Sequence, residues 1–194
     1  MPNSIKNITG FVMAGGGSRR FGSKVDKALV PFRGKPLILH PAETLADFFA
    51  EVTIIAKNRP AYENLGFPVI EDAHEAQNPL VGIYTGLKFS STPWNFFAAC
   101  DMPFLSDKVI EKLMKTVVEN DGGQAKIIVP KTGACLQPMA ALYHRSLIDI
   151  IEEKQDEIDS LKALINHVPA LEINFESDRA FINVNTREQL RNLH

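Results

Sequence analysis

Short apolar runs alternate along the chain with segments whose apolar residues recur at helical spacing. The runs predict buried strands at residues 8–14, 51–57, 67–72, 95–101 and 125–130. Near-continuous apolar strands separated by helices are typical of a parallel sheet that is covered on both faces. We therefore expect one α/β domain over residues 1–194, with a mostly parallel sheet, helices on both faces and a mixed-direction edge.

Helical spacing predicts helices within residues 35–49, 107–120 and 186–193. Ser106 and Thr186 precede the last two of these and are suitable N-caps, and the glycines within 121–124 mark the end of the second. Residues 136–154 begin with an extended pattern and become helical, whereas residues 170–175 predict a strand. The chain has no internal repeat, low-complexity tract or linker-like boundary, which favours a single domain.

Composition and charge are those of an ordinary globular protein. Hydrophobic residues make up 45% of the 194, and the net charge of −2 gives no general attraction to nucleic acid or to a membrane surface. The first residues are polar, unlike a signal peptide, and no apolar run approaches the roughly 18 residues of a membrane span. Cys100 and Cys135 cannot form a disulfide framework, and the histidines show no metal-ligand spacing. We expect a cytoplasmic protein with reduced thiols.

A glycine-rich, basic segment, "MAGGGSRRFGSKVDKAL" at residues 13–29, follows the first predicted strand. Such segments bind phosphate because glycines let backbone N–H groups approach its oxygen atoms. The dinucleotide pattern GxGxxG does not fit, since Arg20 stands where its third glycine belongs. A Walker A loop does not fit either, since "GSK" stands in place of "GKS". The alternative without a ligand is a glycine-rich turn with solvated basic side chains.

The segment fits a third template, in which a strand is followed by "AGGGSRRFG", a short gap and "DKAL". Gly15, Gly16 and Gly17 can turn their N–H groups toward phosphate oxygens. Arg19 and Lys27 supply positive charge from opposite ends of the loop. This arrangement resembles the loop "LAGGxSxRMGxDK" of nucleotidyltransferases, which couple a nucleoside triphosphate to a phosphorylated acceptor.

Segments spread over nearly the whole chain resemble the molybdenum cofactor guanylyltransferases. "SRRFG" and "DKAL" match this family's loop, with Phe21 in place of its usual methionine. "VIEDAHEAQNPLVGIYTGL" resembles the family's "DxxxxxGPLAGIxxGL", with Asn78 for its glycine and Val81 for its alanine. "AACDMPFL", "QPMAALYH" and "FINVNTREQL" match three further segments, and Arg187 replaces the proline of the last.

This resemblance implies a Rossmann-like nucleotidyltransferase domain that transfers GMP from GTP to the terminal phosphate of molybdopterin and releases pyrophosphate. It implies Mg²⁺ as the cofactor and GTP and molybdopterin as the substrates. It also implies accessory or acceptor proteins of the cofactor pathway as possible partners. The catalytic residues it implies are Lys27, Arg19 and Asp101. The nucleotide-binding residues it implies are Ala14, Gly15, Gly16, Gly17, Lys27, Asp72, Pro79, Gly82 and Asp101.

Asp101 ends a predicted buried strand, and this position supports a role in ligand binding. In open α/β sheets, ligands bind in the crevice beyond the carboxyl ends of the strands. A carboxylate there can bind magnesium, and the resemblance makes Asp101 a magnesium ligand. The alternative is that Asp101 caps the following turn. The neighbouring Cys100 is assigned no chemistry, because a cysteine at a buried strand end is usually a small apolar residue.

Recognition of guanine is expected at two segments. Asp72 ends a predicted strand, and a carboxylate can accept hydrogen bonds from guanine N1–H and N2–H₂. Binding of the ribose and orientation of the loop remain alternative roles for Asp72. The sequence "NPLVGI" predicts a kinked turn from Pro79 to Gly82, in which Gly82 permits close approach of the backbone.

The segment "FINVNT" is expected on the acceptor side. If it is extended, Asn183 and Asn185 share one face while Ile182 and Val184 pack on the core. Amides there can offer oxygen to a metal and N–H to an anion without adding charge. The resemblance places both asparagines beside the magnesium and the acceptor phosphate. The alternative is that Asn185 only turns the chain into the closing helix.

Other functions remain open at the level of sequence. A phosphate nucleophile is already ionised at neutral pH, so the expected reaction needs no general base, and the chain has no obvious Ser/His/Asp set. The nearest alternatives are a molybdopterin cytidylyltransferase and a cobinamide-phosphate guanylyltransferase. A sugar-nucleotide pyrophosphorylase is disfavoured because those chains usually carry a larger sugar-binding region. A non-catalytic GTP-binding module would not need Asp101 and Lys27 together.

Overall fold

The structure is a computed structural model that describes residues 8–14, 26–72, 78–120 and 123–193. Within them, eight strands form the central sheet. They are β1 (Ile8–Ala14), β4 (Val52–Ala56), β5 (Val69–Glu71), β6 (Trp94–Ala99), β7 (Ile127–Thr132), β8 (Cys135–Leu136), β9 (Ala140–His144) and β10 (Ala170–Phe175). The strand order is β10-β7-β9-β6-β1-β4-β5, and β8 pairs with β7 outside this path.

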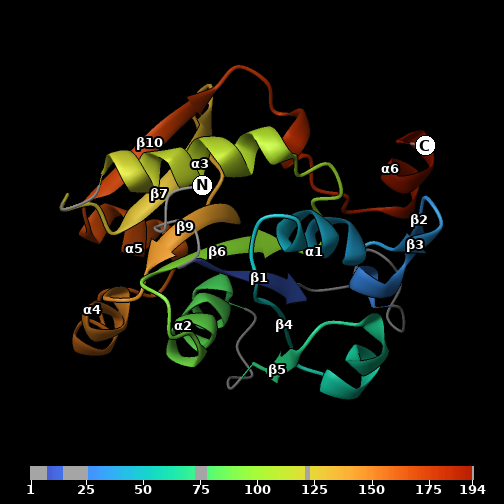
Figure 1. Cartoon of the computed structure of the whole chain (residues 1–194), viewed down its shortest axis with the longest axis horizontal. Helices are drawn as coiled ribbons and strands as arrows, with labels where there is room; N and C mark the ends of the chain where they lie inside the picture. Colours follow the sequence, from blue (N-terminus) through green and yellow to red (C-terminus); the bar gives the residue numbers. More distant parts are fainter. Residues whose placement is uncertain (1–7, 15–25, 73–77, 121–122, 194) are drawn as a thin grey trace.

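The direction of the strands confirms the expected fold class. β1 pairs in parallel with both β4 and β6, and β4 pairs in parallel with β5. β9 runs antiparallel to β6 and to β7, so the mixed direction begins beyond β6, with β9 inside the sheet. The carboxyl ends of β1, β4, β5 and β6 therefore lie at the same edge of the sheet, and the arrows of β1 and β6 point to the right in Figure 1.

Helices cover both faces of the sheet (Figure 1). The helices over the sheet are α1 (Leu39–Ala46), α2 (Pro79–Phe89), α3 (Asp107–Glu119), α4 (Leu147–Glu153) and α5 (Leu161–His167), and α6 (Arg187–Asn192) lies beyond the sheet near the end of the chain. The buried side chains of α1 and α3 belong to one core cluster, and those of α2, α4 and α5 belong to another. None of the helices in the described part of the chain is long and apolar enough to span a membrane.

The double covering explains the continuous apolar pattern of the strands. All seven residues of β1 are buried, because successive side chains point into opposite core clusters. Val12 packs on the side of α1 and α3. Phe11 packs on the side of α2 and stacks on Phe97 of β6, with ring centroids 5.0 Å apart.

Most expected elements are present, with shifted boundaries. The predicted helix of residues 35–49 begins only at Leu39, because a small hairpin precedes it. This hairpin joins β2 (Pro31–Phe32) to β3 (Lys35–Pro36) through Arg33 and Gly34, which have positive φ angles of 46° and 85°. Ser106 occupies the N-cap position of α3, although its side chain makes no capping hydrogen bond. The sequence reading did not anticipate α5 or the β2–β3 hairpin.

The expected turn from Pro79 to Gly82 is wrong, because these residues form the first turn of α2. The Asn78 side chain caps this helix by accepting a hydrogen bond from Leu80 N at 3.0 Å. Proline is well suited to the first helical position, where its missing N–H would have no intrahelical partner. The dipeptide "NP" is therefore a helix start here.

The last part of the chain, residues 184–193, packs against the segment that follows Asp26. Val184 and Leu190 of the closing segment share a buried cluster with Phe32 and Leu37 of the hairpin region. Thr186 caps α6 as expected and forms a capping box with Gln189. The closing segment is thereby fixed beside the carboxyl edge of the sheet (Figure 1).

Candidate active site

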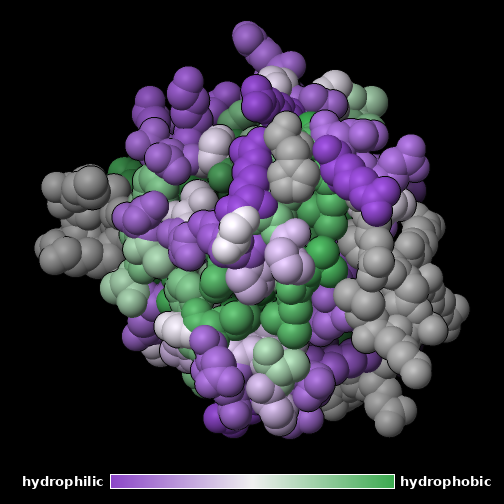
Figure 2. Space-filling model, turned by 90° about the vertical axis from the view of Figure 1, so that its right-hand side faces the viewer, coloured by the Kyte–Doolittle hydropathy of each residue, from purple (hydrophilic) through white to green (hydrophobic). Residues whose placement is uncertain are grey.

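The candidate site lies at the carboxyl edge of the parallel strands, where a crevice is expected in an open α/β sheet. Ala14, Ala56, Glu71 and Ala99 are the last residues of β1, β4, β5 and β6. Figure 2 shows the molecule from this end, where apolar residues reach the surface between polar side chains. Hydrophilic and hydrophobic residues therefore lie side by side on this face of the molecule.

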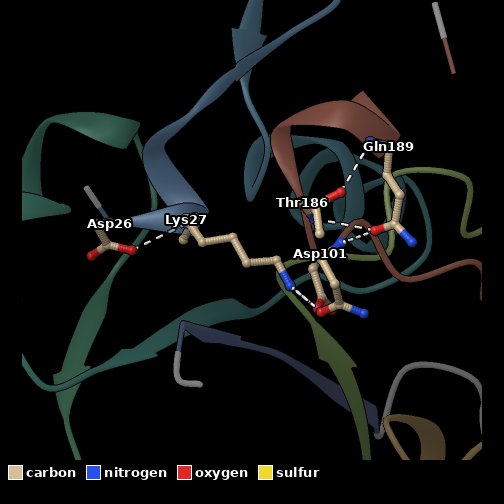
Figure 3. Close-up of polar contacts among 7 residues, drawn as sticks. Asp26, Lys27, Asp101, Thr186 and Gln189 are labelled. Atoms are coloured by element: carbon tan, nitrogen blue, oxygen red, sulfur yellow. Dashed lines mark hydrogen bonds and ion pairs between the residues drawn. The ribbon is translucent and has the colours of Figure 1, made fainter. Parts of the chain in front are cut away.

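Lys27 brings its ammonium group to the end of β6. It is the first residue of the short 3-10 helix η3 (Lys27–Leu29). Its Nζ forms an ion pair with Asp101 Oδ2 and donates a hydrogen bond to Asn185 Oδ1 at 2.7 Å (Figure 3). Three residues far apart in the sequence thus meet around one positive charge.

Backbone hydrogen bonds fix Asp101 from two sides. Cys100 N donates to Met13 O at 3.2 Å, which ties the end of β6 to β1. Val184 N donates to Asp101 O at 2.9 Å, which ties it to the closing segment. The side chains of Lys27 and Asp101 are only 14% and 17% exposed, so solvent screens their attraction less than on an open surface.

Asn185 both contacts Lys27 and leads into α6. Its backbone N donates to Gln189 Oε1 at 2.6 Å, next to the capping box of Thr186 and Gln189 (Figure 3). The two roles considered for Asn185 are therefore compatible in the structure. Val184 is fully buried beside it, which anchors the segment in the core.

Asn183 makes no hydrogen bond to the Lys27 cluster in the described part of the chain, although it is only two residues from Asn185. Its neighbour Phe181 ends the 3-10 helix η6 (Arg179–Phe181), so the segment is not extended from Phe181 as expected. Asn183 is exposed and lines a cleft of about 560 Å³ together with residues of the β7–β8 turn. Burial alternates around Val184 as expected, since Val184 is buried and the asparagines on either side are not. Among the described residues, however, only Asn185 of the two asparagines contacts Lys27.

Asp72 lies at the start of the connection from β5 to α2. Its Oδ1 accepts a hydrogen bond from Thr85 Oγ1 of α2 at 3.2 Å, and its backbone N donates to Ala56 O at 3.2 Å. A Cβ atom built on Gly82 would lie 2.4 Å from Met13 Cε and 3.9 Å from Asp72 Oδ2. Gly82 therefore leaves room for the end of the Met13 side chain between α2 and β1, next to Asp72.

Several predicted site residues lie outside the described residues. These are Gly15, Gly16, Gly17 and Arg19. The structure does describe the two ends of their segment, Ala14 at the end of β1 and Lys27 in η3.

The donor set is suited to a magnesium ion that also takes ligands from its substrate. Among the described residues there is no group of three or more His, Cys, Asp or Glu side chains that could hold a metal. Magnesium in nucleotide sites is usually held by one or two carboxylates, with water and substrate phosphates as its other ligands. Asp101 and Asn185 present oxygen atoms of that kind, and the Lys27 ammonium contacts both. Both oxygen atoms thus already contact one positively charged group.

Cys100 remains without a chemical role in the structure. Its thiol is buried, and burial together with the neighbouring Asp101 raises the pKa of Cys100 far above its usual range. The protonated thiol is a poor nucleophile.

Sequence reasoning missed one contact at the base of the site. Tyr62 OH donates a hydrogen bond to Asp26 Oδ2 at 2.5 Å, and Asp26 Oδ1 accepts from Ala28 N at 3.1 Å. Asp26 belongs to the "DKAL" motif, so the motif contained that signal. Tyr62 lies in a connection between two strands, where no motif marks it.

Comparisons with known proteins found one matching family model and relatives that extend over nearly the whole chain. The family model described as "MobA-like NTP transferase domain" matches residues 10–172. The chain is 34% identical to the molybdenum cofactor guanylyltransferase of Ralstonia nicotianae over 202 residues, covering 96% of each chain. It is 32% identical to the enzyme of the same name from Cupriavidus metallidurans, covering 96% of this chain and 94% of that one.

Solved structures with the same fold were also found. The molybdopterin-guanine dinucleotide biosynthesis protein A of Archaeoglobus fulgidus superposes with a TM-score of 0.76 at 24% identity, covering 95% of each chain. A putative protein from Aquifex aeolicus gives a TM-score of 0.75 at 26% identity, covering 93% of this chain and 94% of that one. A CMP-2-keto-3-deoxy-manno-octonic acid synthetase gives 0.75 at 13% identity, which is a likeness of fold alone.

Proposed function

The chain belongs to the MobA-like NTP transferase family, and we propose that it transfers GMP from GTP to the terminal phosphate of molybdopterin. The observation that carries this proposal is the meeting of Lys27, Asp101 and Asn185 at the carboxyl edge of the parallel sheet. The relatives named molybdenum cofactor guanylyltransferase cover nearly the whole chain, which supports the same reaction.

The reaction joins an oxygen of the acceptor phosphate to the α-phosphorus of GTP, and the bond from that phosphorus to the bridging oxygen of pyrophosphate breaks. The acceptor phosphate is ionised at neutral pH, so no side chain has to remove a proton. The demand on the protein is alignment of the two phosphates and stabilisation of negative charge. Lys27 meets that demand with a charge held in a partly buried position.

Asp101 and Asn185 are the residues that would hold Mg²⁺, because their oxygen atoms already surround the Lys27 ammonium. When bound, this ion would neutralise charge on the triphosphate and on the departing pyrophosphate. Arg19 would add positive charge, and the backbone N–H groups of Gly15, Gly16 and Gly17 would donate hydrogen bonds to phosphate oxygens.

The guanine base would lie near Asp72 and the start of α2. Thr85 orients the Asp72 carboxylate through Oδ1, and the carboxylate can accept from guanine N1–H and N2–H₂. Pro79 and Gly82 belong to this wall, because Pro79 begins α2 and Gly82 leaves room for the Met13 side chain of β1.

A nucleotide panel tests the proposal. Pyrophosphate release is measured with GTP, CTP and ATP in the presence of Mg²⁺, with and without molybdopterin. We expect release with GTP only when molybdopterin is present, little release with CTP or ATP, and loss of release when a chelator removes the metal. Faster release with CTP would identify a cytidylyltransferase, and GTP binding without release would identify a non-catalytic module.

Variants of the Lys27 cluster complete this test. Asp101→Asn should lower the rate about 100-fold or more, because it removes the charge that holds both the lysine and the metal. Lys131→Ala is the matched control, since Lys131 forms an ion pair with Glu172 on the surface of β7 and β10. An unchanged rate in Asp101→Asn would remove Asp101 from the mechanism.

A further inference from the structure

Tyr62 is a buried phenol that contacts the candidate site from a distant segment. It lies between the 3-10 helices η4 (Arg59–Ala61) and η5 (Glu63–Leu65), in the connection from β4 to β5. Its ring is only 2% exposed and belongs to the core cluster of α1 and α3. Its hydroxyl group donates to Asp26 Oδ2 at 2.5 Å across 36 residues of sequence.

Asp26 carries this contact to the backbone of η3. Oδ1 of the same carboxylate accepts from Ala28 N at 3.1 Å, which makes Asp26 the N-cap of η3. Lys27 is the first residue of that helix and lies between the two residues of the cap. The phenol therefore limits how the carboxylate can turn, and the carboxylate limits where the Lys27 backbone can lie.

The other end of Lys27 is fixed as well. Its ammonium group contacts Asp101 and Asn185 (Figure 3). The residue is therefore held both at its backbone and at its Nζ atom in this structure. A free lysine side chain has many rotamers. When a metal ion takes the place of the ammonium on Asp101 and Asn185, the backbone anchor of Lys27 on η3 remains, and it lowers the entropic cost of aligning the released charge with the triphosphate.

We propose that Tyr62 is a positioning residue, which acts through Asp26 to place Lys27 for transfer of the nucleotidyl group. This inference rests on the proposed function, because it assigns to Lys27 a charge that must be aligned with the triphosphate. The phenol itself does not touch the reacting atoms.

The protonation state of Tyr62 agrees with the role of donor. Burial, reinforced by the hydrogen bond to Asp26, raises the pKa of Tyr62 far above its usual range. The hydroxyl group therefore keeps its proton at physiological pH, and Asp26 accepts.

Tyr62→Phe removes the hydroxyl group and keeps the buried ring. We expect kcat for GMP transfer to fall about tenfold, while the dissociation constant of GTP changes less than about twofold, because alignment is lost rather than binding. Tyr143→Phe is the matched control, since Tyr143 is also fully buried and its hydroxyl group donates to a backbone carbonyl, that of Pro138, at 2.8 Å. Tyr143→Phe should lower the melting temperature by a similar amount without lowering kcat.

A double variant that combines Tyr62→Phe with Lys27→Ala separates positioning of the lysine from a general structural effect. If Tyr62 acts through Lys27, then Tyr62→Phe should not slow Lys27→Ala any further, so the two effects should not add. Equal kcat in the wild type and Tyr62→Phe, or full additivity in the double variant, would overturn the inference. The proposed function fails separately, if the wild type shows no transfer with GTP and molybdopterin.

Discussion

Replacement of Lys27 by alanine should have opposite effects on metal binding and on catalysis. The Lys27 ammonium contacts the two oxygen atoms, one from Asp101 and one from Asn185, that we assign to Mg²⁺. Without nucleotide, an incoming metal ion has to displace this ammonium. Lys27→Ala removes the competitor, so the nucleotide-free protein should bind a divalent cation more tightly than the wild type does.

The size of the effect follows from how strongly Lys27 and Asp101 attract each other. An exposed ion pair contributes about 0.2–1 kcal/mol, and the loss of one partner of a buried pair costs about 3–5 kcal/mol. The side chains here are 14% and 17% exposed, which places the pair between these limits, at about 1–3 kcal/mol. At about 1.4 kcal/mol per factor of ten, the dissociation constant of the metal should fall about 5- to 150-fold.

Electron paramagnetic resonance of free Mn²⁺ measures this constant, since Mn²⁺ also prefers oxygen ligands. Lys131→Ala, which removes a lysine from a surface ion pair, should bind Mn²⁺ as the wild type does. The rate of GMP transfer in Lys27→Ala should fall at the same time, because the charge aligned with the triphosphate is lost. Mn²⁺ binding that is unchanged or weaker in Lys27→Ala would show that the ammonium does not occupy the metal position.

Three further predictions concern the site and its support. Asn185→Ala should slow transfer to molybdopterin at saturating GTP more than Asn183→Ala does, because only Asn185 of the two accepts a hydrogen bond from Lys27 among the described residues; equal rates would contradict this. Gly86→Ala should lower stability to urea, because its Cβ would lie 2.6 Å from a buried phenyl ring, and overpacking costs about 1–3 kcal/mol against about 1 kcal/mol gained in helix propensity. Gly82→Ala, whose Cβ meets the flexible end of a methionine at 2.4 Å, should be nearly neutral, and the opposite ranking would refute the packing argument. Burial lowers the pKa of His144, so its contribution to stability should be complete above the unfolded value of about 6.5 and lost as the pH falls below it. Urea unfolding at pH 7.5 and 5.5 tests this, and His144→Gln should show a smaller loss than the wild type.

The sheet and one edge of the site could be predicted from the sequence because they depend on local patterns. Apolar runs of strand length identify the strands, and their separation by helices indicates parallel pairing. Parallel pairing alone puts the carboxyl ends of β1, β5 and β6 at one edge. That is why Asp72 and Asp101 could be expected in a common crevice before any contact was known.

Contacts between distant segments could not be predicted in this way. Lys27 and Asn185 are 158 residues apart, and their hydrogen bond depends on the packing of the hairpin and α6. Tyr62 meets Asp26 only because the fold brings the β4–β5 connection to the start of η3. The start of α2 is a different kind of error, since the capping asparagine and the proline at Pro79 were both visible and were taken for a turn.

The closing segment shows how the site depends on residues outside the part that the family model matches. That match ends at residue 172, yet Asn185 contacts Lys27 and Val184 N donates to Asp101 O. Val184 is also buried against Phe32, which belongs to the hairpin that follows η3. The hairpin therefore continues the segment that carries Lys27 and at the same time holds the segment that carries Asn185. Because one small cluster fixes both, a change in this cluster should disturb the lysine and its amide partner together, even though the central sheet stays intact.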